Sequence, residues 1–201
     1  DDYVGIPAFN YGNKFTVSLW FLKDTAGQQV IYSKKTGQTI ESVQVVNEAD
    51  GKIYASVFSS DNNSIGRKTT DLNSLIGLWS HLVISYDGGN TPSSIKIYVN
   101  GVRADDADFT TGSFTTFNDL SIPSEIGSQN EGDTTFDGKL DEVRVYSRAL
   151  DASEVAKLHN LEVLPPVINT HPANQTVVKG STVNMTVAAT GTEMTYQWQK
   201  A

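Results

Sequence analysis

Cysteine is absent from this chain of 201 residues, and the absence excludes several kinds of chemistry. Without thiols there is no disulfide, no thiolate metal site and no cysteine nucleophile. A disulfide-free composition fits a bacterial exported protein and is unlike the small disulfide-stapled domains of animals. Long apolar runs are also missing, so the sequence predicts neither a membrane span nor a signal peptide.

Basic residues are few: 15 lysines and arginines stand against 23 acidic residues, which gives a net charge of −8. Nucleic acids attract basic surfaces, so this balance argues against a nucleic-acid partner. An acidic surface suits a soluble exported protein or a protein that binds cations. We therefore expect a secreted, extracellular or cell-surface protein without membrane insertion.

The chain does contain a series of short runs rich in β-branched and aromatic residues, each bounded by Gly, Asn, Asp or Pro. Such runs predict β-strands, and many of them in one chain predict an all-β antiparallel sandwich or barrel. Asn100-Gly101, between two runs, is the signal for a tight hairpin. The predicted strands cover residues 15–22, 30–33, 43–46, 52–58, 79–86, 94–100, 124–127 and 140–146.

One short helix is predicted after the last strand. Asp151 and Glu154, three residues apart, form a capping-box pattern, and Val155 and Leu158 then fall on one face. The helix spans little more than two turns, as a short cap on the edge of a sandwich would.

The character of the chain changes beyond this helix. Residues 163–168 contain paired prolines, which predict a stiff linker after a first domain of residues 1–162. Residues 169–201 alternate and then carry Trp198, as the opening strands of an immunoglobulin-like domain do. We expect a truncated immunoglobulin-like segment there, with Trp198 in its core.

Asp141 interrupts the pattern of the last predicted strand. Strict alternation places it on the same side as Val143 and Val145, which are core residues in character. A buried ionised acid is costly unless it has partners, and the usual partners are a metal ion or backbone amides. Pairing with Arg144 or Arg148 is a further alternative. We therefore single out Asp141 as the first candidate site residue.

Four segments in order carry a resemblance to a known family: residues 15–20, 79–87, 95–101 and 136–150. The last segment contains Asp141-Glu142-Val143-Arg144-Val145-Tyr146-Ser147-Arg148-Ala149-Leu150. Over roughly residues 1–160 the chain resembles the laminin-G-like, concanavalin A-like jelly-roll family in its bacterial form. The resemblance implies a two-sheet jelly roll whose first strand is missing here. It also implies a module of secreted multidomain proteins that act on or attach to polysaccharides.

The same resemblance implies a structural calcium ion. Asp141 matches the acidic position that often holds this ion, and Asp1 and Asp2 could approach it. In the related pentraxins, a loop at the place of Gln129-Asn130-Glu131-Gly132-Asp133 carries calcium that binds the ligand. The resemblance therefore makes Asn130, Glu131 and Asp133 secondary candidates for calcium ligands. An ordinary solvated turn is the alternative for this loop.

A sugar-binding face pairs an aromatic platform with hydrogen-bonding groups. If their strands lie side by side, Tyr54, Tyr98 and His81 can form such a surface; the alternative is that these side chains are core. We expect Trp20 and Trp79 to be core.

Catalytic patterns are missing from the sequence. The glucanases of the resembled fold carry Glu-x-Asp-x-x-Glu on one strand, and this chain has no such spacing. The predicted function is therefore a non-catalytic carbohydrate-binding module that holds a secreted multidomain protein on a polysaccharide. The alternative is a structural spacer or protein-binding adhesion module of a surface protein.

Overall fold

The computed structural model describes residues 3–36, 40–60, 63–129, 132, 134–163, 167–190 and 197–198. The chain divides into two compact units, Asp1–Ala156 and Lys157–Ala201. No helix in the described ranges is long and apolar enough to cross a membrane.

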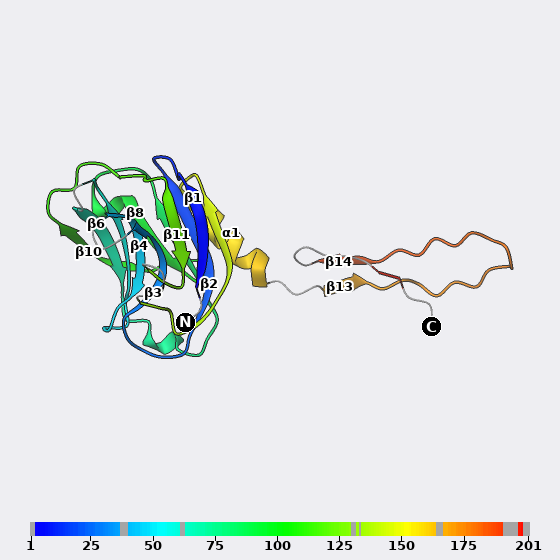
Figure 1. The fold of residues 1–201 in the computed structure, drawn as a ribbon. Helices are drawn as coiled ribbons and strands as arrows, with labels where there is room; N and C mark the ends of the chain where they lie inside the picture. The colour runs from blue at the N-terminus through cyan, green and yellow to red at the C-terminus, as the bar shows by residue number, and fades with distance from the viewer. Residues whose placement is uncertain are drawn as a thin grey trace. The chain divides into compact units, whose positions relative to one another are not determined.

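Two antiparallel sheets form the first unit (Figure 1). The larger sheet has the strand order β1-β11-β3-β4-β5-β6-β10, and the smaller sheet has the order β12-β2-β7-β8-β9. The larger sheet contains β1 (Val4–Phe9), β3 (Gln29–Thr36), β4 (Ile40–Asn47), β5 (Ile53–Phe58), β6 (Ser64–Thr69), β10 (Asp105–Thr111) and β11 (Ile122–Ile126). The smaller sheet contains β2 (Phe15–Lys23), β7 (Ser80–Tyr86), β8 (Ile95–Val99), β9 (Val102–Arg103) and β12 (Gly138–Tyr146).

The core lies between the two sheets. Alternate side chains of the larger sheet, such as Val43, Ile53 and Ala55, meet those of the smaller sheet, such as Val17 and Leu19. This alternation is what a sandwich requires, because residues two apart in a strand share a face. The predicted all-β, two-sheet jelly-roll sandwich is confirmed.

Two local sequence signals are also confirmed. Asn100 and Gly101 take positive φ angles of 51° and 77°, as the tight hairpin between β8 and β9 requires. The helix α1 (Ala152–Val163) begins with the predicted capping box. The Glu154 amide donates to Asp151 Oδ1 over 2.9 Å, and the Asp151 amide donates to Glu154 Oε2 over 3.0 Å.

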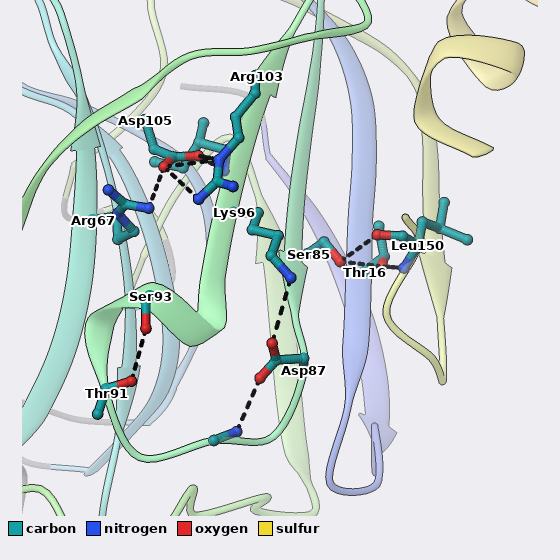
Figure 2. A network of polar contacts seen from close by, with 12 residues as sticks. Thr16, Arg67, Ser85, Asp87, Thr91, Ser93, Lys96, Arg103, Asp105 and Leu150 are labelled. Carbon is teal, nitrogen blue, oxygen red and sulfur yellow. Dashed lines mark hydrogen bonds and ion pairs between the residues drawn. The ribbon is translucent and has the colours of Figure 1, made fainter. Parts of the chain in front are cut away.

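The outer face of the smaller sheet is bonded to the segment that precedes α1 (Figure 2). The Thr16 hydroxyl donates to the Arg148 carbonyl over 2.8 Å and accepts from the Leu150 amide over 2.9 Å. The Ser85 hydroxyl donates to the Leu150 carbonyl over 2.9 Å. Thr16 and Ser85 are buried, so these bonds satisfy polar groups that water does not reach.

A buried lysine on β3 joins the end of β1 to the segment that precedes β11. The Lys34 ammonium donates to the Phe9 carbonyl over 2.5 Å and to Asp119 Oδ1 over 3.2 Å, and it lies 4.2 Å from the centroid of the Tyr11 ring. Asp119 also accepts from the backbone amides of Tyr11 and Gly12. Burial lowers the pKa of Lys34, while its bond to Asp119 acts in the opposite direction.

In the second unit, β13 (Val167–Thr170) pairs with β14 (Ala188–Thr190). Trp198, which we expected in an immunoglobulin-like core, has 58% of its surface exposed. The immunoglobulin-like assignment itself stays a prediction.

Replacing Thr16 by Val, which keeps the shape but removes the hydroxyl, leaves the Leu150 amide and the Arg148 carbonyl without their partner. We expect the free energy of unfolding to fall by about 2–3 kcal/mol, since each buried unsatisfied group costs on the order of 1–3 kcal/mol. Urea denaturation measures this loss. Thr91→Val is the matched control, because among the described residues the exposed Thr91 hydroxyl bonds only to Ser93 (Figure 2). Equal losses in both variants would contradict the assignment.

The core tyrosines predict how stability depends on pH. Burial raises the pKa of Tyr86 to about 12, and its hydroxyl donates to the Gly89 carbonyl over 2.8 Å. An unfolded tyrosine ionises near pH ~10. As the pH rises, the unfolded chain therefore loses this proton before the folded chain does. The contribution of Tyr86 to the free energy of unfolding is fully present below pH ~10 and is lost as the pH rises towards 12. Urea denaturation between pH 8 and 12 should show a shallower decline for Tyr86→Phe than for the wild type; parallel declines would contradict it.

Candidate functional site

The strand that contains Asp141 is bulged, and this overturns the expected burial of its carboxylate. In the pairing of β12 with β2, Asp141 lies opposite Trp20 and Arg144 lies opposite Ser18. Glu142 and Val143 therefore share the place opposite Leu19, and Glu142 takes a φ of 50°. The extra residue shifts the alternation, so that Leu140, Val143 and Val145 face the core while Asp141 is exposed.

Asp141 supports the bulge from outside. Its Oδ1 accepts a 2.7 Å hydrogen bond from the Glu142 amide, which agrees with the backbone-capping alternative. The two arginines considered as partners bind other acids: Arg144 donates to Glu142 over 2.5 Å and Arg148 to Glu154 over 2.7 Å. The premise of a buried Asp141 is wrong, because the bulge places this carboxylate in solvent.

Calcium stays a prediction on this structure. The described residues contain no group of three or more His, Cys, Asp or Glu that could hold a metal ion. Asp1, Asp2, Asn130, Glu131 and Asp133, which the prediction also names, lie outside the described residues. Asp141 alone supplies fewer oxygens than the six to eight that calcium takes.

The proposed surface of Tyr54, Tyr98 and His81 does not form. Tyr98 and His81 are on paired strands of the smaller sheet, β8 and β7, whereas Tyr54 is on β5 of the larger sheet. Tyr98 and His81 are also buried, and burial raises the pKa of Tyr98. His81 Nε2 lies 2.9 Å from the Ser18 hydroxyl. The prediction joined strands that belong to different sheets, since sequence parity does not reveal which strands are neighbours.

The expected burial of the two first-domain tryptophans is also wrong. Trp79 has 44% of its surface exposed, just before β7, and Trp20 is half-buried. Trp20 lies on the outer face of β2, with its ring centroid 5.3 Å from that of His81. The core positions of β2 are taken instead by Val17, Leu19 and Phe21.

Tyr54 belongs to a groove on the outer face of the larger sheet. We call it the sheet groove; it has a volume of about 280 Å³ and crosses β4, β5, β6 and β10. Cross-strand pairs put its residues in register: Gln44 is opposite Ser56, Ser56 opposite Gly66, and Gly66 opposite Phe109. Its lining residues are Glu41, Gln44, Val46, Glu48, Tyr54, Ser56, Phe58, Ser64, Phe109 and Thr111.

Tyr54 and Phe109 form an aromatic pair in the sheet groove. Their ring centroids are 5.3 Å apart with the planes inclined by 46°, and both side chains are half-buried. The Phe109 ring lies over Gly66, where an added Cβ would come within 2.1 Å of its Cζ. Gly66 is therefore required by the close approach of the ring. Lys68 approaches Tyr54 from the next strand, with Nζ 3.3 Å from its hydroxyl.

Two side-chain polar groups beside this pair have no hydrogen-bond partner in the described chain, although Ser56 itself is largely buried. The side-chain amide of Gln44 donates through Nε2 to Gln129 Oε1 over 2.8 Å. Its side-chain oxygen, Oε1, has no partner in the described chain. The Ser56 hydroxyl likewise has no hydrogen-bond partner among the described residues. The sheet groove thus combines aromatic faces with a free acceptor and a free hydroxyl, which is the composition of a ligand site.

Sequence reasoning found part of this groove. The parity of β5 correctly grouped Tyr54, Ser56 and Phe58 on one face. It missed Phe109 and Gly66, which belong to strands that the sequence pattern did not reveal. The signal that could have found β10 is the run of acids in Asp105–Thr111 facing the basic β6, since Arg67 forms ion pairs with Asp105 and Asp108.

The calcium prediction can be tested by melting. We expect a chelator to lower the melting temperature if the ion is bound, because a ligand of the native state stabilises it. Asp141→Ala should abolish the difference between calcium and chelator, while Asp106→Ala, an exposed acid on β10, should leave it intact. A wild-type melting curve that chelation does not move would remove the calcium prediction.

Solved structures share this sandwich at low sequence identity. A native heptameric SAP-like pentraxin from Limulus polyphemus has a TM-score of 0.57 and 15% identity, with 78% of this chain and 75% of the pentraxin covered. Domain 4 of an extracellular arabinanase from Geobacillus stearothermophilus, solved with arabinotriose, has a TM-score of 0.53 and 24% identity, with 78% and 72% covered. The receptor-binding domain of botulinum neurotoxin type G has a TM-score of 0.53 and 14% identity, with 80% and 42% covered.

Sequence comparison identifies the family. An adhesion G-protein coupled receptor V1 from Danio rerio is 28% identical over 150 residues, which are 73% of this chain but only 2% of that receptor. The chain thus spans a small piece of this relative. Residues 1–156 match the laminin G-type family described as the concanavalin A-like lectin/glucanases superfamily. This match covers most of the chain, and the two-sheet fold agrees with it. The protein therefore belongs to the concanavalin A-like lectin/glucanases superfamily.

Proposed function

We propose that the first unit is a non-catalytic carbohydrate-binding module and that the sheet groove is its binding site. The observation that carries the proposal is the aromatic pair Tyr54–Phe109 beside two polar groups without a partner in the described chain. These groups are the side-chain amide oxygen of Gln44 and the Ser56 hydroxyl. Sugar rings present apolar C–H faces and hydroxyl edges. An aromatic face receives the first, and fixed acceptors and hydroxyls receive the second.

The extent of the sheet groove favours an oligosaccharide over a single sugar. Its lining residues come from four adjacent strands, β4, β5, β6 and β10. Neighbouring strands are about 4.8 Å apart, so the groove spans about 14 Å across the sheet. A ligand of several sugar units can therefore contact both the Gln44 side and the Phe109 side.

The placement of carboxylates supports a binding role without hydrolysis. Glu41 and Glu48 line the sheet groove at the two ends of β4. Seven residues of extended strand separate them by about 23 Å, whereas glycosidases need two carboxyls within about 5–9.5 Å. Glu41 is also bound by Lys35. This spacing does not suit the two acids for general acid–base work, and the engagement of Glu41 by Lys35 makes that residue still less suitable.

The setting of the module is inferred from the family and from the solved neighbours. One of these, domain 4 of the arabinanase, was solved with arabinotriose, which favours a sugar ligand for this chain as well. We propose a secreted bacterial multidomain protein that the module holds on a polysaccharide. The receptor-binding domains among the neighbours make a protein-binding adhesion module or spacer the second candidate.

Affinity electrophoresis against a polysaccharide panel tests this function. Tyr54→Ala should lower the affinity for the glycan that retards the wild-type protein about tenfold, since an aromatic stacking contact contributes roughly 0.5–1.5 kcal/mol beyond its buried area. Trp79→Ala is the matched control, because Trp79 is an exposed aromatic residue outside the sheet groove. Retardation that Trp79→Ala removes and Tyr54→Ala preserves would move the site away from the groove; no retardation by any glycan would favour the spacer.

A further inference from the structure

We propose that the sheet groove selects uncharged glycans and rejects those that carry carboxylate or sulfate groups. This inference rests on the proposed function and adds the chemical class of the ligand. Its basis is the distribution of charge along the groove and the engagement of the cations that lie near it.

The described lining of the sheet groove contains two carboxylates, Glu41 and Glu48, and no lysine or arginine. Acidic sugars are recognised by cations, and most directly by arginine through paired hydrogen bonds. A uronate or sulfate in this groove would meet like charge without a lining cation to compensate it.

The cations on neighbouring positions are engaged with other groups. Lys35 is bound to Glu41, and both side chains are nearly covered. Arg67 on β6 is held by Asp105, which also binds Arg103 (Figure 2). Lys68 lies over the Tyr54 ring, with Nζ 5.1 Å from the ring centroid.

Lys68 and Asp50 share the hydroxyl of Tyr54. The Tyr54 hydroxyl accepts from Lys68 Nζ over 3.3 Å and lies 3.3 Å from Asp50 Oδ2, to which it donates. The ammonium and the carboxylate are thus linked through this hydroxyl and form no direct ion pair in the described chain, and Asp50 Oδ2 also lies 3.9 Å from Lys52 Nζ. Lys68 therefore contacts the groove through Tyr54 and is not itself one of its lining residues.

Glu48 is the acid whose charge remains uncompensated. Its two carboxylate oxygens accept from Gln28 Nε2 over 3.2 and 3.1 Å, and no described cation lies within ion-pair distance of it. The amide of Gln28 orients the carboxylate without neutralising it. Glu48 thus repels an acidic sugar locally, and the chain's net charge of −8 opposes polyanions at longer range.

The same groups suit a neutral sugar. The oxygens of Glu48 and the free carbonyl of Gln44 are acceptors, and sugar hydroxyls are donors. A hydroxyl-rich ligand can satisfy both acceptors without bringing a second negative charge. The groove therefore fits polysaccharides whose only polar groups are hydroxyl, ether or acetamido groups.

The test compares neutral and acidic polysaccharides on the full chain at low ionic strength. Neutral arabinan, galactan, xylan and glucan form one set of probes, and polygalacturonate, alginate and a sulfated galactan form the other. Glu48→Gln removes the charge and keeps the shape. Asp87→Asn, in the β7–β8 turn of the smaller sheet, is the matched control, because it changes the net charge equally away from the groove.

We expect wild-type protein to bind at least one neutral polysaccharide and none of the acidic ones. Glu48→Gln should shift the affinity ratio towards acidic glycans about fivefold, the factor that one like-charge contact in water gives, and the shift should shrink as salt screens the charge. Asp87→Asn should leave the ratio unchanged.

The outcomes separate the two proposals. Wild-type binding of polygalacturonate or alginate as tight as that of any neutral glycan, and weakened by Tyr54→Ala, would overturn charge selection and leave carbohydrate binding in the groove standing. An equal shift in Asp87→Asn would also overturn it, by assigning the effect to net charge. Failure of all probes to bind any variant would remove carbohydrate binding, and charge selection with it.

Discussion

The buried ammonium of Lys34 is the constraint on which the larger sheet depends. It has no water to solvate it, so it is stable only while Asp119 and the Phe9 carbonyl hold it. Removal of one partner of a buried ion pair typically costs about 3–5 kcal/mol, because the other charge stays buried and uncompensated. The connection that carries Asp119 must therefore stay against β3. It thereby places the turn between β1 and β2, whose amides Asp119 also accepts.

This constraint reaches the sheet groove through the residue before Asp119. The Asn118 carbonyl accepts from the Ser42 hydroxyl over 2.7 Å, and the Asn118 amide donates to the Phe58 carbonyl over 2.9 Å. Phe58 lines the groove, and Ser42 lies on β4 beside it. One end of the sheet groove is thus tied to the ion pair. A charge on β3 and an aromatic residue on β5 become parts of one rigid arrangement.

The fold could be predicted from the sequence because the strands of a sandwich have local signals, namely alternation of apolar residues and turns such as Asn100-Gly101. Sequence reasoning failed at Asp141, because Glu142 adopts a left-handed conformation that no glycine or asparagine marks. It also failed to assemble the site. The alternation of β5 identified Tyr54. Phe109, however, comes from β10, a strand rich in acids that is held by its pairing with Arg67 of β6. Such a strand is stabilised by its neighbour rather than by its own propensity.

The missing side chain of Gly66 has a thermodynamic consequence for binding. Because the Phe109 ring fills the space that a Cβ would take and rests against Tyr54, its rotamer is restricted before any ligand arrives. A flexible aromatic side chain would lose rotational freedom on binding, at a cost of roughly 0.5–1.5 kcal/mol. In this groove that entropy is already lost during folding. For the proposed glycan ligand, the ordering on binding would then be mainly that of the ligand itself.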